Sequence, residues 1–292
     1  MSIYKIKDLE TLSGVKAHTI RIWEKRYNIL SPERTVSKIR AYNNDELTHL
    51  LNLSMLNKNG YKISALSLLS CDEISQLVWK LRKDITVDGS QENLIAALIN
   101  LDEELFRNTL GKLIETIGLE KTFSQHLIPF LDRIGIMWLV GSIHAAQEHF
   151  ISNLIRQKII SEIDRQVIPE VTTTPILLYL PEHEWHEISL LFYQYLLRSK
   201  GLHTVYIGQS LPYSSLQSCI EKLNPKSILT CWLTSVDHKF MVSYFKQLHK
   251  DAGGIPIYAG GAQINLNIDL VKKYITEIKN SGSLLKHFEE SV

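Results

Sequence analysis

The sequence predicts a multidomain protein: an α winged helix-turn-helix, then a four-helix bundle, then an α/β domain with a doubly wound parallel sheet of the flavodoxin-like, Rossmann type. Three observations support this order. A basic helix-turn-helix pattern occupies the first 75 residues, helical spacing of apolar residues runs from 91 to 166, and strand-like and helix-like runs alternate from 167 to 292. Residues 76–90 are expected to form a linker with a short helix, so the predicted domains are 1–75, 91–166 and 167–292.

Composition is that of an ordinary globular protein. Of the 292 residues 45% are hydrophobic and 22% are charged, and the net charge is +1. No run of about 18 apolar residues occurs and the N-terminus lacks the pattern of a signal sequence, so we expect a cytoplasmic protein with no membrane partner. Cys71, Cys219 and Cys231 are too scattered for a disulfide framework or a cysteine-based zinc site.

A helix-turn-helix is predicted near the N-terminus. Residues 3–12 read as a first helix, followed by a short turn that contains glycine, and residues 19–26 read as a second helix. In the second helix Ile20, Ile22 and Trp23 are the apolar residues, and they are expected to form the face that packs inward. The cations of that helix are then left to project elsewhere, as in a recognition helix.

A two-stranded wing is expected after this helix because Pro32 removes a backbone donor. Its strands would be residues 30–35 and 39–42, with Ser37-Lys38 at the tip. Over residues 1–40 nine Lys and Arg stand against four Asp and Glu, an excess of +5. This excess of positive charge suits binding to double-stranded DNA. Contacts to the phosphates supply affinity, and contacts to base edges supply sequence choice. The expected DNA contacts are Thr19, Arg21, Lys25, Arg26, Tyr27, Arg34, Lys38, Arg40 and Tyr42.

Four helices with short breaks predict the bundle. Pro129 lies inside the third helix and is expected to kink it. Trp138 ends that helix, and Glu148-His149 lie in the fourth. From the residues alone, the tryptophan is expected in the core and the adjacent polar pair is expected to face solvent. The predicted helices are residues 91–100, 103–117, 120–139 and 142–165.

The last domain alternates strands with helices. Strands are predicted at residues 176–180, 204–207, 227–233, 256–259 and 276–279, and helices at 186–200, 213–223, 238–250 and 266–274. In such sheets ligands lie beyond the carboxyl ends of the strands. The loops there contain acidic and histidine residues, a Thr-Ser pair and a Gly pair. No G-x-G-x-x-G motif follows the first strand and no P-loop motif occurs, which makes a nicotinamide dinucleotide or NTP hydrolysis a poor match.

The N-terminal residues resemble a known family. The run TIRIWEKRY, then SPERT, then RAY and the helix start NNDEL is similar to the winged DNA-binding domain of MerR-family regulators. The resemblance covers about the first 75 residues. It departs from the family at Ser37-Lys38 and at Asn28, where glycines are usual; Asn tolerates the left-handed conformation better than most residues, so the second change is expected to be mild. The resemblance implies a dimer on inverted half-sites.

The C-terminal domain resembles cobalamin-binding domains. The run Glu184 to Ser189 (EWHEIS), Ser235 and Gly260-Gly261 are similar to the D/E-x-H-x-x-G, Ser and Gly-Gly elements of that family. The resemblance implies that His186 is the lower ligand of the cobalt and that Glu184 orients it. Ser189 replaces the glycine, where a side chain would crowd the nucleotide tail of the cofactor.

The bundle is similar to the cap that covers the upper face of the corrin. Trp138, Glu148 and His149 fit the W-x9-E-H spacing of the CarH and LitR photoreceptor repressors, which are MerR-type regulators. This resemblance implies adenosylcobalamin as cofactor, with Trp138 and Glu148 near the adenosyl group and His149 as a cobalt ligand after photolysis. It also implies a tetramer in the dark that comes apart in light.

Three functions follow as alternatives. The first is a DNA-binding transcriptional regulator, not an enzyme, controlled by adenosylcobalamin and light through its oligomeric state. The second keeps DNA binding but has no cofactor and acts through a protein partner, a reading that Ser189 supports. The third, a corrinoid methyl-transfer component, is disfavoured by the helix-turn-helix and by the W-x9-E-H spacing.

Overall fold

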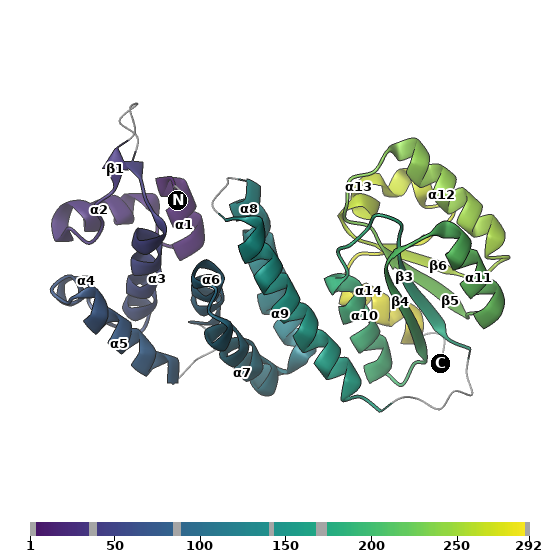
Figure 1. Cartoon of the computed structure of the whole chain (residues 1–292), viewed down its shortest axis with the longest axis horizontal. Coiled ribbons are helices and arrows are strands. Elements are labelled where there is room, and N and C mark those ends of the chain that lie inside the picture. Colours follow the sequence, from purple (N-terminus) through teal and green to yellow (C-terminus); the bar gives the residue numbers. More distant parts are fainter. Residues whose placement is uncertain (1–3, 35–39, 84–88, 140–142, 168–173, 290–292) are drawn as a thin grey trace. The chain divides into compact units, whose positions relative to one another are not determined.

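The computed structural model describes residues 4–34, 40–83, 89–139, 143–167 and 174–289. The chain divides into two compact units, residues 1–154 and 155–292 (Figure 1). The first unit holds the helix-turn-helix and most of the bundle, and the second holds the end of the last bundle helix and the α/β sheet. Among the described residues, no helix is long and apolar enough to cross a membrane.

The predicted helix-turn-helix and wing are present. Gly14 and Asn28 both adopt the left-handed conformation after a helix, with φ of 71° and 52°, which fits the tolerance expected of Asn28. The two strands pair antiparallel, and the predicted wing tip at Ser37-Lys38 lies outside the described residues. The elements are α1 (Ile6–Ser13), α2 (Ala17–Tyr27), β1 (Glu33–Arg34), β2 (Arg40–Ala41), α3 (Asn44–Lys58), α4 (Ile63–Leu66) and α5 (Cys71–Lys83).

One prediction for the recognition helix is wrong. Ile20 is fully buried and Trp23 is 8% exposed, as expected for the inward face, but Ile22 is 51% exposed. At about 3.6 residues per turn, Ile22 lies nearly opposite Ile20 around the helix, so both cannot face the same core. The apolar character of Ile22 was therefore not enough to predict the face of α2 on which it lies.

The bundle follows the prediction with one change in its third helix. Gly118, with φ of 78°, breaks the run that precedes it, and a π-helical turn, Phe123–Leu127, comes just before Pro129. Pro129 has no backbone N–H to donate, and the π-helical turn before it changes the hydrogen-bonding pattern locally. The helix therefore continues through Pro129 with a locally altered pattern of backbone hydrogen bonds. The elements are α6 (Ser90–Asn100), α7 (Glu103–Thr122), η2 (Phe123–Leu127), α8 (Ile128–Leu139) and α9 (Ala145–Asp164).

The second unit is a five-stranded parallel sheet in the order β4-β3-β5-β6-β7, the doubly wound flavodoxin-like order. Helices cover both faces: α10 contacts α14, and α11, α12 and α13 contribute to one apolar core against β3 and β5 (Figure 1). The strands are β3 (Ile176–Pro181), β4 (Thr204–Leu211), β5 (Ser227–Cys231), β6 (Ile257–Gly260) and β7 (Thr276–Ile278), and the helices are α10 (Ile188–Ser199), α11 (Tyr213–Leu223), α12 (His238–Asp251), α13 (Ala262–Val271) and α14 (Ser281–Glu289).

Two predicted limits in this unit are corrected, and one helix was missed. Strand β5 ends at Cys231, earlier than the predicted residue 233, because the backbone amides of Leu233 and Thr234 donate to a side chain instead of a neighbouring strand. Helix α13 begins directly after the Gly pair, at Ala262. Helix α14 was not predicted.

The Gly pair is required by close backbone packing. Gly261 has φ of 99°, and a side-chain carbon there would lie 2.5 Å from the carbonyl oxygen of Trp232. At Gly260 the same carbon would lie 2.8 Å from the carbonyl oxygen of Ile278. Both distances are too short for any side chain, so these glycines allow β6 to lie between its neighbours as it turns into α13.

We predict that Gly261→Ala lowers the free energy of unfolding by roughly 3 kcal/mol or more, because strain at positive φ adds to a clash with backbone. Gly254→Ala is the matched control: Gly254 has φ of 98° but no atom within 4 Å of the added carbon. Its cost is expected to be about 1 kcal/mol. Urea unfolding of the full chain, followed by circular dichroism, measures both; equal midpoints for the two variants would contradict the packing argument.

Candidate functional site

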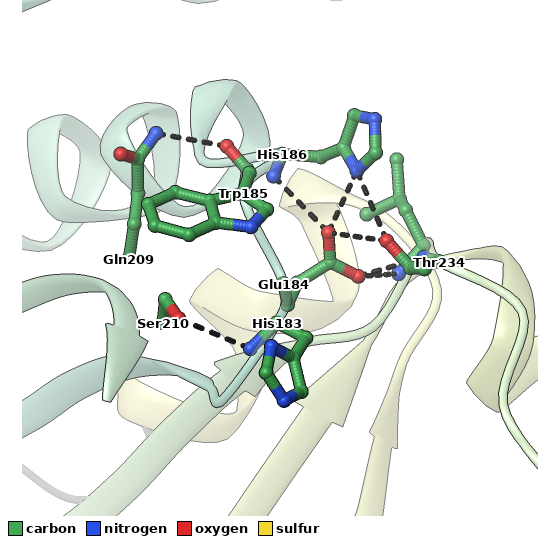
Figure 2. Close-up of polar contacts among 8 residues, drawn as sticks. His183, Glu184, Trp185, His186, Gln209, Ser210 and Thr234 are labelled. Carbon is green, nitrogen blue, oxygen red and sulfur yellow. Dashed lines mark hydrogen bonds and ion pairs between the residues drawn. The ribbon is translucent and has the colours of Figure 1, made fainter. Parts of the chain in front are cut away.

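The site begins where β3 ends. The Glu184 side chain is 3% exposed, and its Oε1 lies 2.7 Å from Nδ1 of His186 (Figure 2). The same oxygen accepts the backbone N–H of His186 at 3.1 Å. Glu184 therefore fixes both the backbone and the ring of the residue two positions away.

The Glu184 carboxylate also ties this loop to the loop after β5. Its Oε2 accepts the backbone N–H groups of Leu233 and Thr234, each at 2.7 Å, and the Thr234 hydroxyl donates to Oε1 at 3.0 Å. Strands β3 and β5 are neighbours in the sheet, so one buried carboxylate joins two loops at its carboxyl edge. The sequence predicts a Thr-Ser pair in this loop, but nothing local in it marks the contacts between Thr234 and Glu184.

These donors decide the charge of Glu184. Burial alone would raise the pKa of this carboxyl group. The hydrogen bonds from the His186 ring and from the amides of Thr234, Leu233 and His186 outweigh burial and lower the pKa to about 2. The group is thus a carboxylate throughout the physiological pH range.

The His186 ring is held at Nδ1 and its side chain is 62% exposed. With a carboxylate at Nδ1, that nitrogen carries the proton in the neutral ring and Nε2 carries the lone pair. A neutral imidazole whose second nitrogen is fixed by an acid is the arrangement that suits a metal ligand. The donor set therefore fits a cobalt-bound corrinoid at this edge of the sheet.

Further contacts shape the loop around this pair. Gln209 Nε2 donates to the carbonyl oxygen of Trp185 at 2.8 Å, and Ser210 Oγ accepts the N–H of His183 at 3.1 Å (Figure 2). The N–H of Ser210 donates to the carbonyl oxygen of Glu184 at 3.1 Å. The end of β4 thus braces the loop, while the Trp185 side chain remains 59% exposed.

Glu187 forms a second buried acid cluster next to the site. Its side chain is 4% exposed and contacts Arg156 of α9, and the Tyr206 hydroxyl of β4 donates to it at 2.5 Å. Burial, and then the hydrogen bond to Glu187, raise the pKa of Tyr206, so the hydroxyl stays protonated and remains a donor. Glu187 appears in the sequence only as one residue of the run EWHEIS, and Arg156 and Tyr206 could not be linked to it because they lie on other elements.

The other residues of this unit that were predicted to bind the cofactor are Ser189, Ser235 and the Gly pair. Ser189 is the second residue of α10 and is half-buried. Ser235 is exposed in the loop after β5, next to Thr234, while Gly260 ends β6 and Gly261 follows it at the same edge. The Gly pair has the structural role described above whether or not a ligand lies near it.

In the first unit, Trp138, Glu148 and His149 lie at the end of α8 and the start of α9. Trp138 is 50% exposed, so the expectation that it belongs to the core is wrong. Glu148 Oε2 lies 2.7 Å from His149 Nδ1, and Ser152 donates to Glu148 Oε1 at 2.5 Å. The result is a second acid–histidine pair near the start of α9 and an exposed tryptophan near the end of α8.

The residues of α2 that were predicted to contact DNA form a basic face of this helix. Arg21, Lys25 and Arg26 are exposed, Thr19 is half-buried, and the Arg26 guanidinium lies 5.5 Å from the centre of the Tyr27 ring. These groups can reach a nucleic acid from one helix. The Arg34 side chain and Lys38 lie outside the described residues.

Arg40 and Tyr42 instead hold the wing to α2. Arg40 Nε donates to both oxygens of Glu24, at 2.9 and 3.1 Å, and the Tyr42 hydroxyl donates to Glu24 at 3.1 Å. The hydrogen bond to Glu24 raises the pKa of Arg40. Tyr42 is 1% exposed and pairs with Tyr4 through the backbone, so its ring packs in the core and is not available to DNA.

Comparisons with known proteins agree with both halves of this description. Residues 4–70 match the family described as MerR HTH family regulatory protein, and residues 90–160 match the B12 binding domain family. The chain is 27% identical over 271 residues to the HTH-type transcriptional repressor CarH of Myxococcus xanthus, with 89% of each chain covered. It is 22% identical over 264 residues to the repressor CarA of the same organism, covering 88% of this chain and 86% of that one.

A solved structure supports the fold of about two thirds of the chain. The monomethylamine corrinoid protein of Methanosarcina barkeri superposes with a TM-score of 0.55 at 12% identity, covering 67% of this chain and 95% of that one. At this identity the likeness concerns the fold alone. The two matched families and the repressor relatives together support a MerR-type transcriptional regulator, in which a DNA-binding helix-turn-helix is joined to a cobalamin-binding region that controls it.

Proposed function

We propose that adenosylcobalamin is the controlling cofactor, that light is the signal, and that the protein is a repressor whose oligomeric state sets its affinity for DNA. The observation that carries this proposal is the contact between Glu184 and His186, 2.7 Å long and anchored by two amides from the β5 loop. We also propose the domain limits 1–75, 91–166 and 167–292, with residues 76–90 as the linker.

In this proposal His186 Nε2 is the lower ligand of the cobalt. Glu184 holds the ring and its proton at Nδ1, so that Nε2 is directed as a base. Ser235 and the Gly pair contribute to the same edge. When bound, the cofactor supplies a cobalt–carbon bond that light can break.

Trp138, Glu148 and His149 are proposed to meet the adenosyl group of the cofactor, as the resemblance to the photoreceptor repressors implies. An exposed tryptophan offers a large apolar surface to an adenosyl group, and the Glu148–His149 pair repeats the chemistry of an acid that fixes an imidazole. His149 is then the candidate for a second cobalt ligand. The W-x9-E-H spacing supports this assignment.

The proposed switch is thermodynamic. A ligand that binds only one oligomeric form stabilises that form by mass action. A dimer or tetramer places several α2 helices on one duplex, which raises the effective concentration of each for its half-site. The names of the relatives, both transcriptional repressors, support repression as the output.

Ser189 favours a second candidate function. It lies in the first turn of α10, three positions after the proposed cobalt ligand, where crowding of the nucleotide tail would weaken binding. A regulator without a cofactor would act through contacts with a protein partner. The likeness to a corrinoid protein concerns the fold alone and does not favour a methyl-transfer role.

One experiment separates the two candidates. The purified protein is mixed with adenosylcobalamin in the dark, desalted, and its visible spectrum and elution volume are recorded before and after green illumination. The proposal requires retained colour, a spectrum that changes with light, and a changed elution volume. Complete loss of colour on desalting favours the regulator without a cofactor.

We predict that His186→Ala removes the spectral signature of a histidine ligand and weakens cobalamin binding by at least tenfold. His183→Ala is the matched control, since His183 is exposed in the same loop and is held through its backbone N–H. Difference spectra during titration with adenosylcobalamin measure both effects. Identical spectra for the wild type and His186→Ala would defeat the ligand assignment.

Glu184 predicts a specific pH dependence of stability. Its pKa is depressed from the ordinary 4.5 to about 2, so its contribution is present above about pH 4.5 and is lost as pH falls towards 2. Glu184→Gln should therefore cost on the order of 2 kcal/mol at pH 7 and progressively less at lower pH. Urea midpoints at pH 7, 4.5 and 3 measure this. Glu182→Gln, an exposed neighbour, is the control, and a Glu184→Gln cost that is constant with pH would reject the argument.

Lys25 is predicted to meet a phosphate. Lys25→Ala should lower affinity for all duplexes by a similar factor and reduce the slope of log K against log salt by about 1. Lys246→Ala, an exposed lysine on α12, is the control and should change neither. Fluorescence anisotropy of the full-length protein with labelled duplex, at several salt concentrations, gives both quantities; an unchanged slope would exclude a phosphate contact.

A further inference from the structure

Ile22 is an exposed apolar residue in the middle of a cationic helix face. Its side chain is 51% exposed, whereas the two apolar residues beside it, Ile20 and Trp23, are buried and supply the packing of α2. The fold therefore does not need Ile22 to be apolar. A single exposed isoleucine is common on protein surfaces, so its neighbours decide whether it has a role.

The neighbours of Ile22 are the residues that a helix places three and four positions away. His18, Lys25 and Arg26 occupy these positions on the solvent side, and all three are exposed. Arg21 is exposed as well, at the edge of the same face. A partner that covers Ile22 must offer an apolar group while it presents negative charge to the surrounding cations. A second protein surface of apolar character would leave these cations desolvated and unpaired.

Duplex DNA meets both requirements at once. Its phosphates flank the major groove, and inside the groove the apolar group that the bases offer is the C5 methyl of thymine. We infer that Ile22 contacts a thymine methyl in the major groove and is a residue that determines the sequence preference of this protein. The inference rests on the proposed function in one respect, that α2 is the helix that enters the groove.

The test removes the methyl group without changing base pairing. A preferred duplex is first selected from a randomised library with the full-length protein, and each thymine of one half-site is then replaced in turn by deoxyuridine. Wild-type protein should lose about fourfold in affinity at one or two positions, corresponding to ~0.8 kcal/mol for one buried carbon group. Ile22→Ala should bind the selected duplex more weakly and should no longer distinguish thymine from uracil at those positions.

Lys25→Ala is the matched variant on the same face. It should lower affinity but keep the full discrimination between thymine and uracil. Wild-type binding that is indifferent to uracil at every position overturns the inference, as does an Ile22→Ala variant that keeps the same discrimination. Failure to enrich any duplex sequence at all is a different result, because it overturns the DNA-binding function and the inference together.

Discussion

A single buried carboxylate holds the crevice of the α/β unit together. Glu184 is 3% exposed, and an ionised group so far from water must have its oxygens fully hydrogen-bonded. Its donors come from its own loop and from the loop after β5, so the charge joins the two loops and fixes the His186 ring as a consequence. Loss of this one anion would release the imidazole and both loop ends.

The DNA-binding domain uses the same device. The Glu24 side chain, 15% exposed, accepts hydrogen bonds from Arg40 and Tyr42 and so joins the recognition helix to the wing. The wing is only two residues long on each strand in its described part, too short to set its own position. In both domains an acid on one element therefore orients a functional group or segment on another, and the exposed groups nearby are left for the ligand.

Helix α9 also carries a residue that supports the second acid cluster. Arg156 contacts the buried Glu187 that follows the proposed cobalt ligand. Arg156 and Glu187 are therefore positioning residues within the second unit, and Tyr206 keeps their contact in place.

Local chemistry was enough to predict much of this protein. The sequence determined the helix-turn-helix, the left-handed Asn28 and nearly all the strands, because these depend on residues a few positions apart. It also located Glu184 and His186, which are two positions apart. Only the tertiary structure decided that Thr234 bonds to Glu184 across fifty positions of sequence, that Trp138 and Ile22 are exposed, and that Arg40 pairs with Glu24. These contacts depend on the order of the strands and the packing of helices, which no short window of sequence contains.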